Sequence, residues 1–117
     1  MKIALTTAGN DLKAPLDSRF GRAPKFLIYD LESDSFEIVD NTQNLNAAQG
    51  AGVQSGELVV REGASVLITG HCGPKAFRVL SAAGVAVFNG GTGTVEQAIE
   101  SYKKGELQKA CLLYTSD

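Results

Sequence analysis

The sequence predicts a single α/β domain built on a partly parallel sheet. Two continuous apolar runs, residues 66–69 and 85–88, are typical of parallel strands that are covered on both faces. The stretch between them has apolar residues at helical spacing, so the three segments form a strand–helix–strand crossover unit. The length of 117 residues suits one domain with one core. We therefore expect residues 1–117 to form a single domain.

Strands dominate the first half of the chain. Residues 2–6 form a short apolar run that leads into a long loop punctuated by Gly, Pro and Asp. Residues 25–31 and 35–40 are rich in β-forming side chains, and the polar residues between them predict a hairpin. Long loops in compact domains often carry function, which makes the loop before the hairpin a candidate.

A first helix is predicted over residues 47–62. Gly63 follows it as a stop. Three glycines weaken the helical pattern, and we expect them to allow the helix to pack closely on the sheet. They are Gly50, Gly52 and Gly56.

Two further helices are predicted in the second half. One covers residues 74–83, with Pro at its first position and Gly84 after its end. The other begins at Thr94, which forms a capping-box pair with Gln97. The apolar run 110–114 is expected to form a final edge strand.

Charge and cysteine content limit the classes of partner. The chain has 11 Lys and Arg against 13 Asp and Glu, so it has no overall attraction for nucleic acid or an anionic membrane. The N-terminus has neither the apolar core of a signal peptide nor a spanning helix, and a cytoplasmic location is expected. Two cysteines cannot supply the four thiolates of a conventional iron–sulfur cluster. Any anion site must therefore be local.

The loops that follow three predicted strands are rich in small and polar residues. They cover residues 6–10, 69–74 and 89–94. If the strands are mutually parallel, the loops share one edge of the sheet, where ligands bind in open α/β sheets. Two of the loops also lead into helix N-termini, whose amide groups favour an anion. We expect a glycine-rich crevice at this edge.

The segment Arg19-Phe20-Gly21-Arg22 lies on the long loop that could fold over the same edge. Arg presents permanently charged donors that suit anions. The segment has two interpretations that the sequence leaves open. It could contribute to the site, or it could be a solvated loop whose Phe20 packs into the core.

Cys72 and His71 are adjacent soft or borderline metal ligands on the crevice loop. We expect a thiol at a helix N-terminus to ionise more easily than usual. The alternative is a packed cysteine beside a solvent-facing histidine. Cys111 lies in an apolar run and is interpreted as a core residue. No acid–base pair and no oriented nucleophile can be assigned, so the sequence gives little indication of catalysis.

Several segments together resemble the dinitrogenase iron–molybdenum cofactor biosynthesis family, and the likeness covers nearly the whole chain. The segments are MKIALTT, RFGRAPKFLIYD, NLNAAQGAGVQSGELVV, GHCGPKAFRVLSAAGVAVF and GTVEQAIESYKKGEL. The chain looks most like the small stand-alone members, which include a carrier of a molybdenum–copper sulfide cluster that is not an established enzyme.

The resemblance implies an RNase H-like α/β fold with a mixed five-stranded sheet flanked by helices. It also implies a non-catalytic protein that carries a molybdenum-containing sulfide cluster, with Mo–Cu–S favoured over Fe–Mo–S. Some cofactor-carrying relatives have His where this chain has Arg19, so here the cluster is expected to be held by charge, amide donors and apolar walls. A cluster-donor or cluster-acceptor protein is the expected partner, and the protein is expected to be a monomer or a weak homodimer.

The crevice and the resemblance together predict the site residues and leave two alternative functions open.

A small enzyme or regulator that binds a phosphorylated metabolite or nucleotide in the same crevice is the alternative function. An adaptor that works through a protein partner and leaves the crevice empty is a third. Direct metal contact is expected from Cys72 and His71, and the cluster-binding residues are expected to be Asn10, Arg19, Phe20, Gly21, Arg22, Gly70, Gly73, Pro74, Lys75, Asn89, Gly91 and Thr92.

Overall fold

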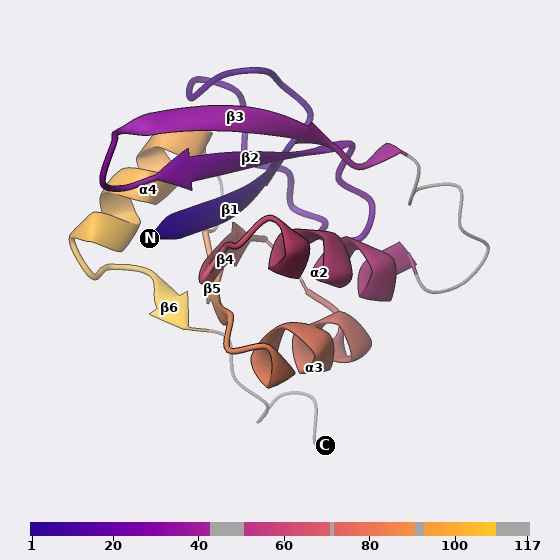
Figure 1. Ribbon diagram of the computed structural model, residues 1–117. Coiled ribbons are helices and arrows are strands. Elements are labelled where there is room, and N and C mark those ends of the chain that lie inside the picture. The colour runs from indigo at the N-terminus through magenta and orange to yellow at the C-terminus, as the bar shows by residue number, and fades with distance from the viewer. Residues whose placement is uncertain (43–50, 71, 91–92, 110–117) are drawn as a thin grey trace.

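The computed structural model describes residues 1–42, 51–70, 72–90 and 93–109. It is an α/β fold in which strands and helices alternate through the second half of the chain (Figure 1). In chain order the elements are β1 (Lys2–Thr7), β2 (Lys25–Asp30), β3 (Ser35–Asp40), α2 (Ala51–Arg61), β4 (Val66–Thr69), α3 (Pro74–Ala82), β5 (Ala86–Asn89), α4 (Val95–Lys103) and β6 (Gln108–Lys109).

The strands form one mixed sheet in the order β3-β2-β1-β4-β5-β6. Strand β1 pairs in parallel with β4, and β4 pairs in parallel with β5. The β2–β3 hairpin adds antiparallel strands at one edge, and β6 is antiparallel to β5 at the other. The five strands predicted as elements of the sheet are confirmed, and β6 adds a short sixth. The edge strand predicted over 110–114 lies outside the described residues.

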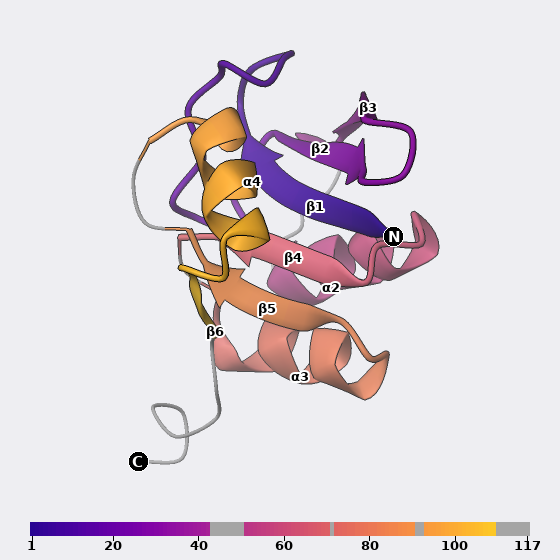
Figure 2. The same cartoon turned by 90° about the vertical axis from the view of Figure 1, so that its left-hand side faces the viewer.

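The sheet separates two apolar cores. Helices α2 and α3 cover one face and α4 covers the other (Figure 2). Side chains alternate between the faces along β1, where Ala4 joins the α2–α3 core while Ile3 and Leu5 join the α4 core. Ile3 and Leu5 are fully buried, and burial of each side chain contributes about 1.5–3 kcal/mol to the stability of the folded state.

The predicted C-terminal ends of α2 and α3 agree with the structure to within one residue. Gly63 and Gly84 adopt φ of 80° and 83° after α2 and α3, in the left-handed region that glycine occupies without strain. Thr94 accepts a hydrogen bond from the Gln97 amide, and the Gln97 side chain accepts one from the Thr94 amide, which completes the predicted capping box. Helices α2 and α3 each end one residue earlier than predicted, and the predicted start of the first helix lies outside the described residues.

The glycines of α2 pack on a helix and not on the sheet. A Cβ added at Gly52 would lie 3.5 Å from the Cβ of Ala76, and one at Gly56 would lie 3.4 Å from a methyl group of Val79. Both partners belong to α3. The expectation of close packing is right in kind but wrong in its partner, because the small residues let two helices approach each other. Gly50 lies outside the described residues.

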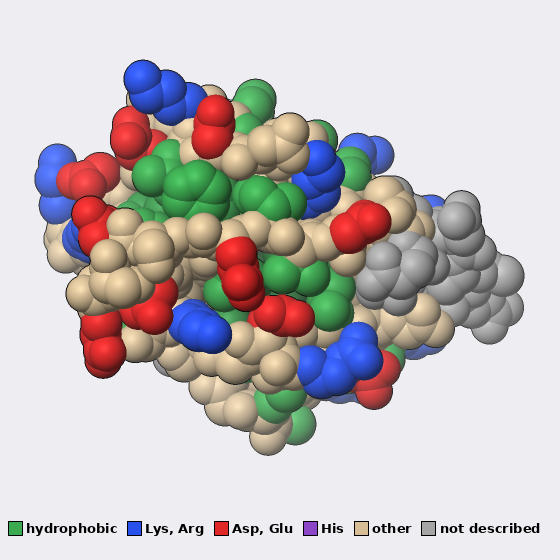
Figure 3. All heavy atoms as spheres, turned by 45° about the horizontal axis from the view of Figure 1, so that its top comes forward, with side chains coloured by type: hydrophobic (Ala, Val, Ile, Leu, Met, Phe, Trp, Pro, Cys, Tyr) green, Lys and Arg blue, Asp and Glu red, His purple; other side chains and the backbone are tan. Residues whose placement is uncertain are grey.

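The molecular surface carries mixed charge. On the face shown in Figure 3, Lys and Arg side chains are interspersed with Asp and Glu, and apolar side chains are exposed between them. None of the described helices has the length and apolar character that crossing a bilayer requires.

Candidate functional site

The long loop between β1 and β2 folds back over the carboxyl ends of the parallel strands. The Asp17 amide donates to the Thr6 carbonyl at 2.7 Å, and the Thr6 hydroxyl lies 2.7 Å from the Asp17 carbonyl. The Leu16 amide donates to the carbonyl of Gly93 at 2.9 Å. Thr6 also hydrogen-bonds to Thr69, at the end of β4, at 3.0 Å. The loop is therefore hydrogen-bonded to the end of β1 and to the segment that follows β5, while the Thr6–Thr69 bond joins the ends of β1 and β4.

Glycines at the strand ends make room for this loop. A Cβ at Gly70 would lie 2.6 Å from Cα of Ser18, and one at Gly90 would lie 2.6 Å from a Leu16 methyl group. Side-chain atoms essentially never approach so closely, so close packing of the loop explains both glycines. Part of the predicted crevice is thus filled by the chain itself.

The open part of this region is a cavity of about 350 Å³ beside the loop. Its walls come from the loop, from the first described turn of α2 and from the N-terminal turn of α3. The lining is mainly apolar, with one ammonium group at its rim. The lining residues are Phe20, Gly21, Gly52, Val53, Gly73, Pro74, Lys75 and Ala76.

The start of α3 gives this cavity a positive electrostatic character. Gly73 is the N-cap residue and provides no side-chain cap. Pro74 has no amide hydrogen, so the amides of Lys75 and Ala76 are the first donors of the helix, and no capping side chain satisfies them. These groups and the helix dipole favour an anion. The exposed Lys75 side chain adds a full positive charge at the same end of the helix.

Phe20 belongs both to the core and to the cavity wall. Its side chain is 2% exposed, and its ring centroid lies 5.5 Å from that of Phe26 on β2. The two interpretations of this segment are therefore compatible at Phe20. The packed ring anchors the loop in the core, and it also gives the cavity an apolar wall.

Cys72 is buried beneath the N-terminal turn of α3. It is 4% exposed, and its Sγ lies 3.7 Å from the Gly73 carbonyl. Burial raises the pKa of the thiol to about 11, so the expectation of easy ionisation is wrong. Desolvation of the thiolate outweighs the favourable effect of the helix end. Direct metal contact by Cys72 stays a prediction, and His71 lies outside the described residues.

The described part of the chain holds no group of three or more His, Cys, Asp or Glu side chains that could bind a metal ion. The Arg19 side chain is 65% exposed and forms an ion pair with Asp17. Oδ1 of Asp17 accepts a hydrogen bond from the Arg19 backbone amide at 2.9 Å and lies 3.5 Å from the Arg19 Nε. Arg22 is exposed on the same loop. The positive groups of this loop are therefore at the surface, outside the cavity lining.

The structure brings together only some of the predicted site residues. Phe20, Gly21 and the 73–75 segment meet at the cavity. Asn10 instead accepts a hydrogen bond from the Lys25 ammonium group. Asn89 is exposed at the end of β5, and Gly70 lies against the loop. Three predicted residues, His71, Gly91 and Thr92, lie outside the described residues.

Three lining residues were not predicted from the sequence. They are Gly52, Val53 and Ala76. Gly52 carried a usable signal, because a glycine inside a helix indicates close approach by some other group. Val53 and Ala76 are ordinary apolar helix residues, and only the packing of α2 against α3 places them at the cavity.

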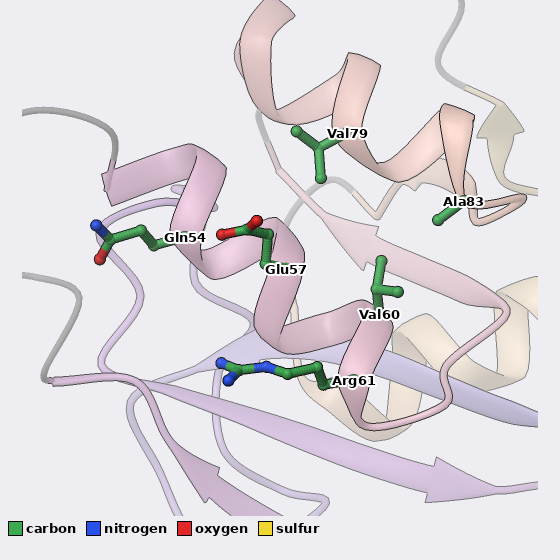
Figure 4. Close-up of a pocket in the computed structure, with 6 residues that line it drawn as sticks. All are labelled: Gln54, Glu57, Val60, Arg61, Val79 and Ala83. Carbon is green, nitrogen blue, oxygen red and sulfur yellow. The ribbon is translucent and has the colours of Figure 1, made fainter.

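A second hollow of about 580 Å³ lies between α2 and the C-terminal half of α3 (Figure 4). Both polar and apolar side chains line it: Gln54, Glu57, Val60, Arg61, Val79 and Ala83. Its mixed lining lacks the helix N-terminus and the aromatic wall of the first cavity, so the first cavity is the stronger candidate for an anionic ligand.

Comparison with known proteins agrees with this architecture. The apo form of the orange protein from Desulfovibrio gigas superposes with a TM-score of 0.91 at 38% identity, with 94% of this chain and 92% of that chain covered. A Thermotoga protein provisionally assigned as NifB has a TM-score of 0.81 at 38% identity, over 92% and 91% of the two chains.

Sequence comparison extends the similarity to an uncharacterized protein of Methanocaldococcus jannaschii. It is 33% identical over 112 residues, which cover 93% of this chain and 91% of that protein. Residues 1–105 match the profile described as dinitrogenase iron–molybdenum cofactor. The chain therefore belongs to the dinitrogenase iron–molybdenum cofactor family.

Proposed function

We propose that the protein is a non-catalytic carrier for a molybdenum-containing metal–sulfide cluster, which it holds non-covalently in the cavity between the loop, α2 and α3. The observation that carries the proposal is the uncapped N-terminus of α3 facing an apolar cavity. Family membership supports a role linked to a metal cofactor. The 38% identity to the orange protein supports a small binding protein.

The cavity provides what a polyanionic sulfide cluster needs. Its volume of about 350 Å³ corresponds to about twelve water molecules in the liquid, which suits a cluster of a few metal and sulfur atoms. The amides of Lys75 and Ala76 would donate to sulfide, and the Lys75 ammonium would offset negative charge. Phe20, Val53 and Pro74 would exclude water and so strengthen these interactions.

Direct coordination by Cys72 and His71 is a separate part of the proposal. The Cys72 thiol has to lose its proton before it can bind a metal, and its raised pKa makes this costly at neutral pH. A carrier that relies on Cys72 would therefore load more readily as the pH rises. A carrier that relies on charge and amide donors would not show this dependence.

Anaerobic reconstitution tests the proposal. Apoprotein is mixed with tetrathiomolybdate and Cu(I), or with tetrathiomolybdate and Fe(II), and freed of unbound metal by gel filtration. Elemental analysis and the visible absorption spectrum are then recorded. We expect near-stoichiometric molybdenum, visible sulfide charge-transfer bands and the higher yield with copper. A colourless, metal-free protein after both treatments would reject the carrier function and favour the alternative, a phosphorylated metabolite or nucleotide.

Two variants of α3, one of a lysine and one of an arginine, test in the same experiment whether the cluster binds in this cavity. Lys75→Ala removes the ammonium group at the cavity, and Arg78→Ala removes an exposed cation one turn further along α3. We expect Lys75→Ala to weaken cluster binding about three- to tenfold at low salt, with a smaller loss at high salt because salt screens exposed charges. Arg78→Ala should leave the affinity within twofold. Equal losses would place the cluster elsewhere.

The remaining expectations stay predictions. They are the single domain, the RNase H-like description of the fold, the cytoplasmic location, the donor or acceptor partner, the oligomeric state, and cluster binding by the predicted site residues that do not line the cavity. Nuclease activity is not part of the proposal, because β1 carries no carboxylate that could hold a catalytic metal.

A further inference from the structure

A buried asparagine joins two walls of the cavity. Asn41 follows β3 directly and is fully buried. Its Nδ2 donates to the carbonyl of Ala23 at 2.9 Å, and its backbone amide donates to the carbonyl of Pro24 at 2.8 Å. The same side chain is paired with Ser55 through Nδ2 at 3.1 Å and Oδ1 at 3.3 Å.

The two partners of Asn41 lie close to the cavity lining. Ala23 ends the turn that begins at Phe20, since the Ala23 amide donates to the Phe20 carbonyl at 3.3 Å. Ser55 lies one helical turn after Gly52 on α2. Asn41 is therefore the joint between the loop wall, which carries Phe20 and Gly21, and the helix wall, which carries Gly52 and Val53.

The chemistry of this joint favours one geometry. An apolar side chain of similar size could fill the same space but could not fix the distance between a loop carbonyl and a helix hydroxyl. Buried hydrogen bonds are directional, and a buried amide that loses its partners is strongly disfavoured. The loop and α2 can therefore separate or slide only by breaking bonds that water does not replace.

We propose that Asn41 is a positioning residue of the cluster cavity, which holds the Phe20–Gly21 wall against α2 and so sets how firmly the cargo is retained. This rests on the carrier function proposed above. Residues that hydrogen-bond to metal ligands without touching the metal typically affect metal affinity about 10- to 100-fold, and we expect the same range for a residue that positions the cavity wall. Retention should fall within this range when the joint is broken.

Two variants break the joint to different extents. Asn41→Asp keeps the shape but places an oxygen against the Ala23 carbonyl, so it repels the loop. Ser55→Ala removes only the bond to α2 and leaves the bonds to the loop. The matched control is Ile99→Ala, which removes a buried side chain from the α4 core on the opposite face of the sheet and so lowers stability without touching the cavity.

The test compares cluster release with stability. Dissociation of the reconstituted molybdenum cluster is followed by visible absorption in the presence of excess chelator, and the stability of each variant is measured by urea unfolding. We expect Asn41→Asp to speed release about 10- to 100-fold and Ser55→Ala by less, whereas Ile99→Ala should leave release within threefold. If Asn41→Asp and Ile99→Ala release the cluster equally fast at equal loss of stability, the positioning role is wrong.

Hydrogen exchange of the apoprotein separates this proposal from the carrier function. The Ala23 amide serves as the reporter, because it is hydrogen-bonded within the loop turn. We expect Asn41→Asp and Ser55→Ala to speed exchange of the Ala23 amide more than exchange of the α4 amides. Ile99→Ala should speed exchange of the α4 amides more than that of the Ala23 amide. If the parent protein binds no cluster, the carrier function fails, and this exchange pattern still tests the joint. Unchanged exchange at Ala23 would overturn it.

Discussion

Cys72 is subject to two opposing demands at the scale of a single residue. Its position before α3 suggests an activated thiol, but the side chain is buried in the α2–α3 core, the cluster that also contains Phe20, Ala76 and Phe77. Burial prevails, because taking a thiolate out of water costs more than a helix end returns. The folded state is stabilised when the Cys72 thiol keeps its proton, whereas binding a metal requires the thiol to lose it.

This conflict predicts a loss of stability at alkaline pH. The folded pKa of Cys72 is about 11, against an ordinary value near 9. The folded state keeps the proton when the unfolded state has lost it, so the stabilisation is complete below pH 9 and is lost as the pH rises towards 11. The loss should reach about 2–3 kcal/mol. Urea unfolding between pH 8 and pH 11 measures it.

Cys72→Ala provides the comparison that isolates the thiol. The variant starts from a lower stability because a core atom is missing, but it should lack the part of the alkaline decline that the thiol causes. Tyr29, whose pKa is also raised, chiefly by its hydrogen bond to Asp34, titrates in both proteins. Parallel curves for parent and variant would show that the thiol is not held in its neutral form by the fold.

At the scale of elements, the contact between α2 and α3 defines the inner wall of the cavity. Gly52 and Gly56 both face α3, but only Gly52 lines the cavity. The two positions are separated by one helical turn on the same face, so they differ in their relation to the cavity more than in their local structure. They form a natural matched pair.

Alanine at these two positions should separate stability from binding. Either substitution favours the helical state by about 0.5–1 kcal/mol relative to glycine. At Gly52 the new methyl would lie in ordinary contact with Ala76 and occupy cavity space, so we expect an unchanged or higher stability and weaker cluster binding. Gly56→Ala meets Val79 at 3.4 Å and should leave binding unchanged. Urea unfolding and cluster titration check both. Equal affinities for the two variants would contradict this location of the cargo.

For the molecule as a whole, the sheet was far easier to predict than the site. Continuous apolar runs identified β4 and β5 as parallel strands, since burial on both faces leaves a pattern in the sequence itself. The folding of the 14–18 segment onto the strand ends leaves no such pattern, because it depends on contacts between backbone atoms. Gly70 was expected to be a cluster-binding residue, and the structure packs it against the backbone of Ser18.

The fastening of this loop to the sheet has a testable consequence for global stability. A Cβ at Gly70 would force the Ser18 backbone to move, so Gly70→Ala should lower the free energy of unfolding by about 1–3 kcal/mol. Gly73 has no atom within 4 Å of an added Cβ and has φ of −68°, so Gly73→Ala should cost only about 0.5–1 kcal/mol, because Ala is a poorer N-cap residue than Gly. Urea unfolding compares them. If Gly70→Ala lowers the free energy of unfolding by no more than Gly73→Ala does, the loop can move away from Gly70 at little cost.

The cavity draws its walls from residues 20–21, 52–53 and 73–76, which come together only in the folded chain. No short stretch of the unfolded chain reproduces them. A cargo bound there would therefore act as a folding ligand: at a free concentration 100 times its dissociation constant, it would add about 2.7 kcal/mol to the stability of the native state. Proteases that attack the opened chain would remove empty molecules before loaded ones, so cellular abundance of the protein would follow the supply of its cargo.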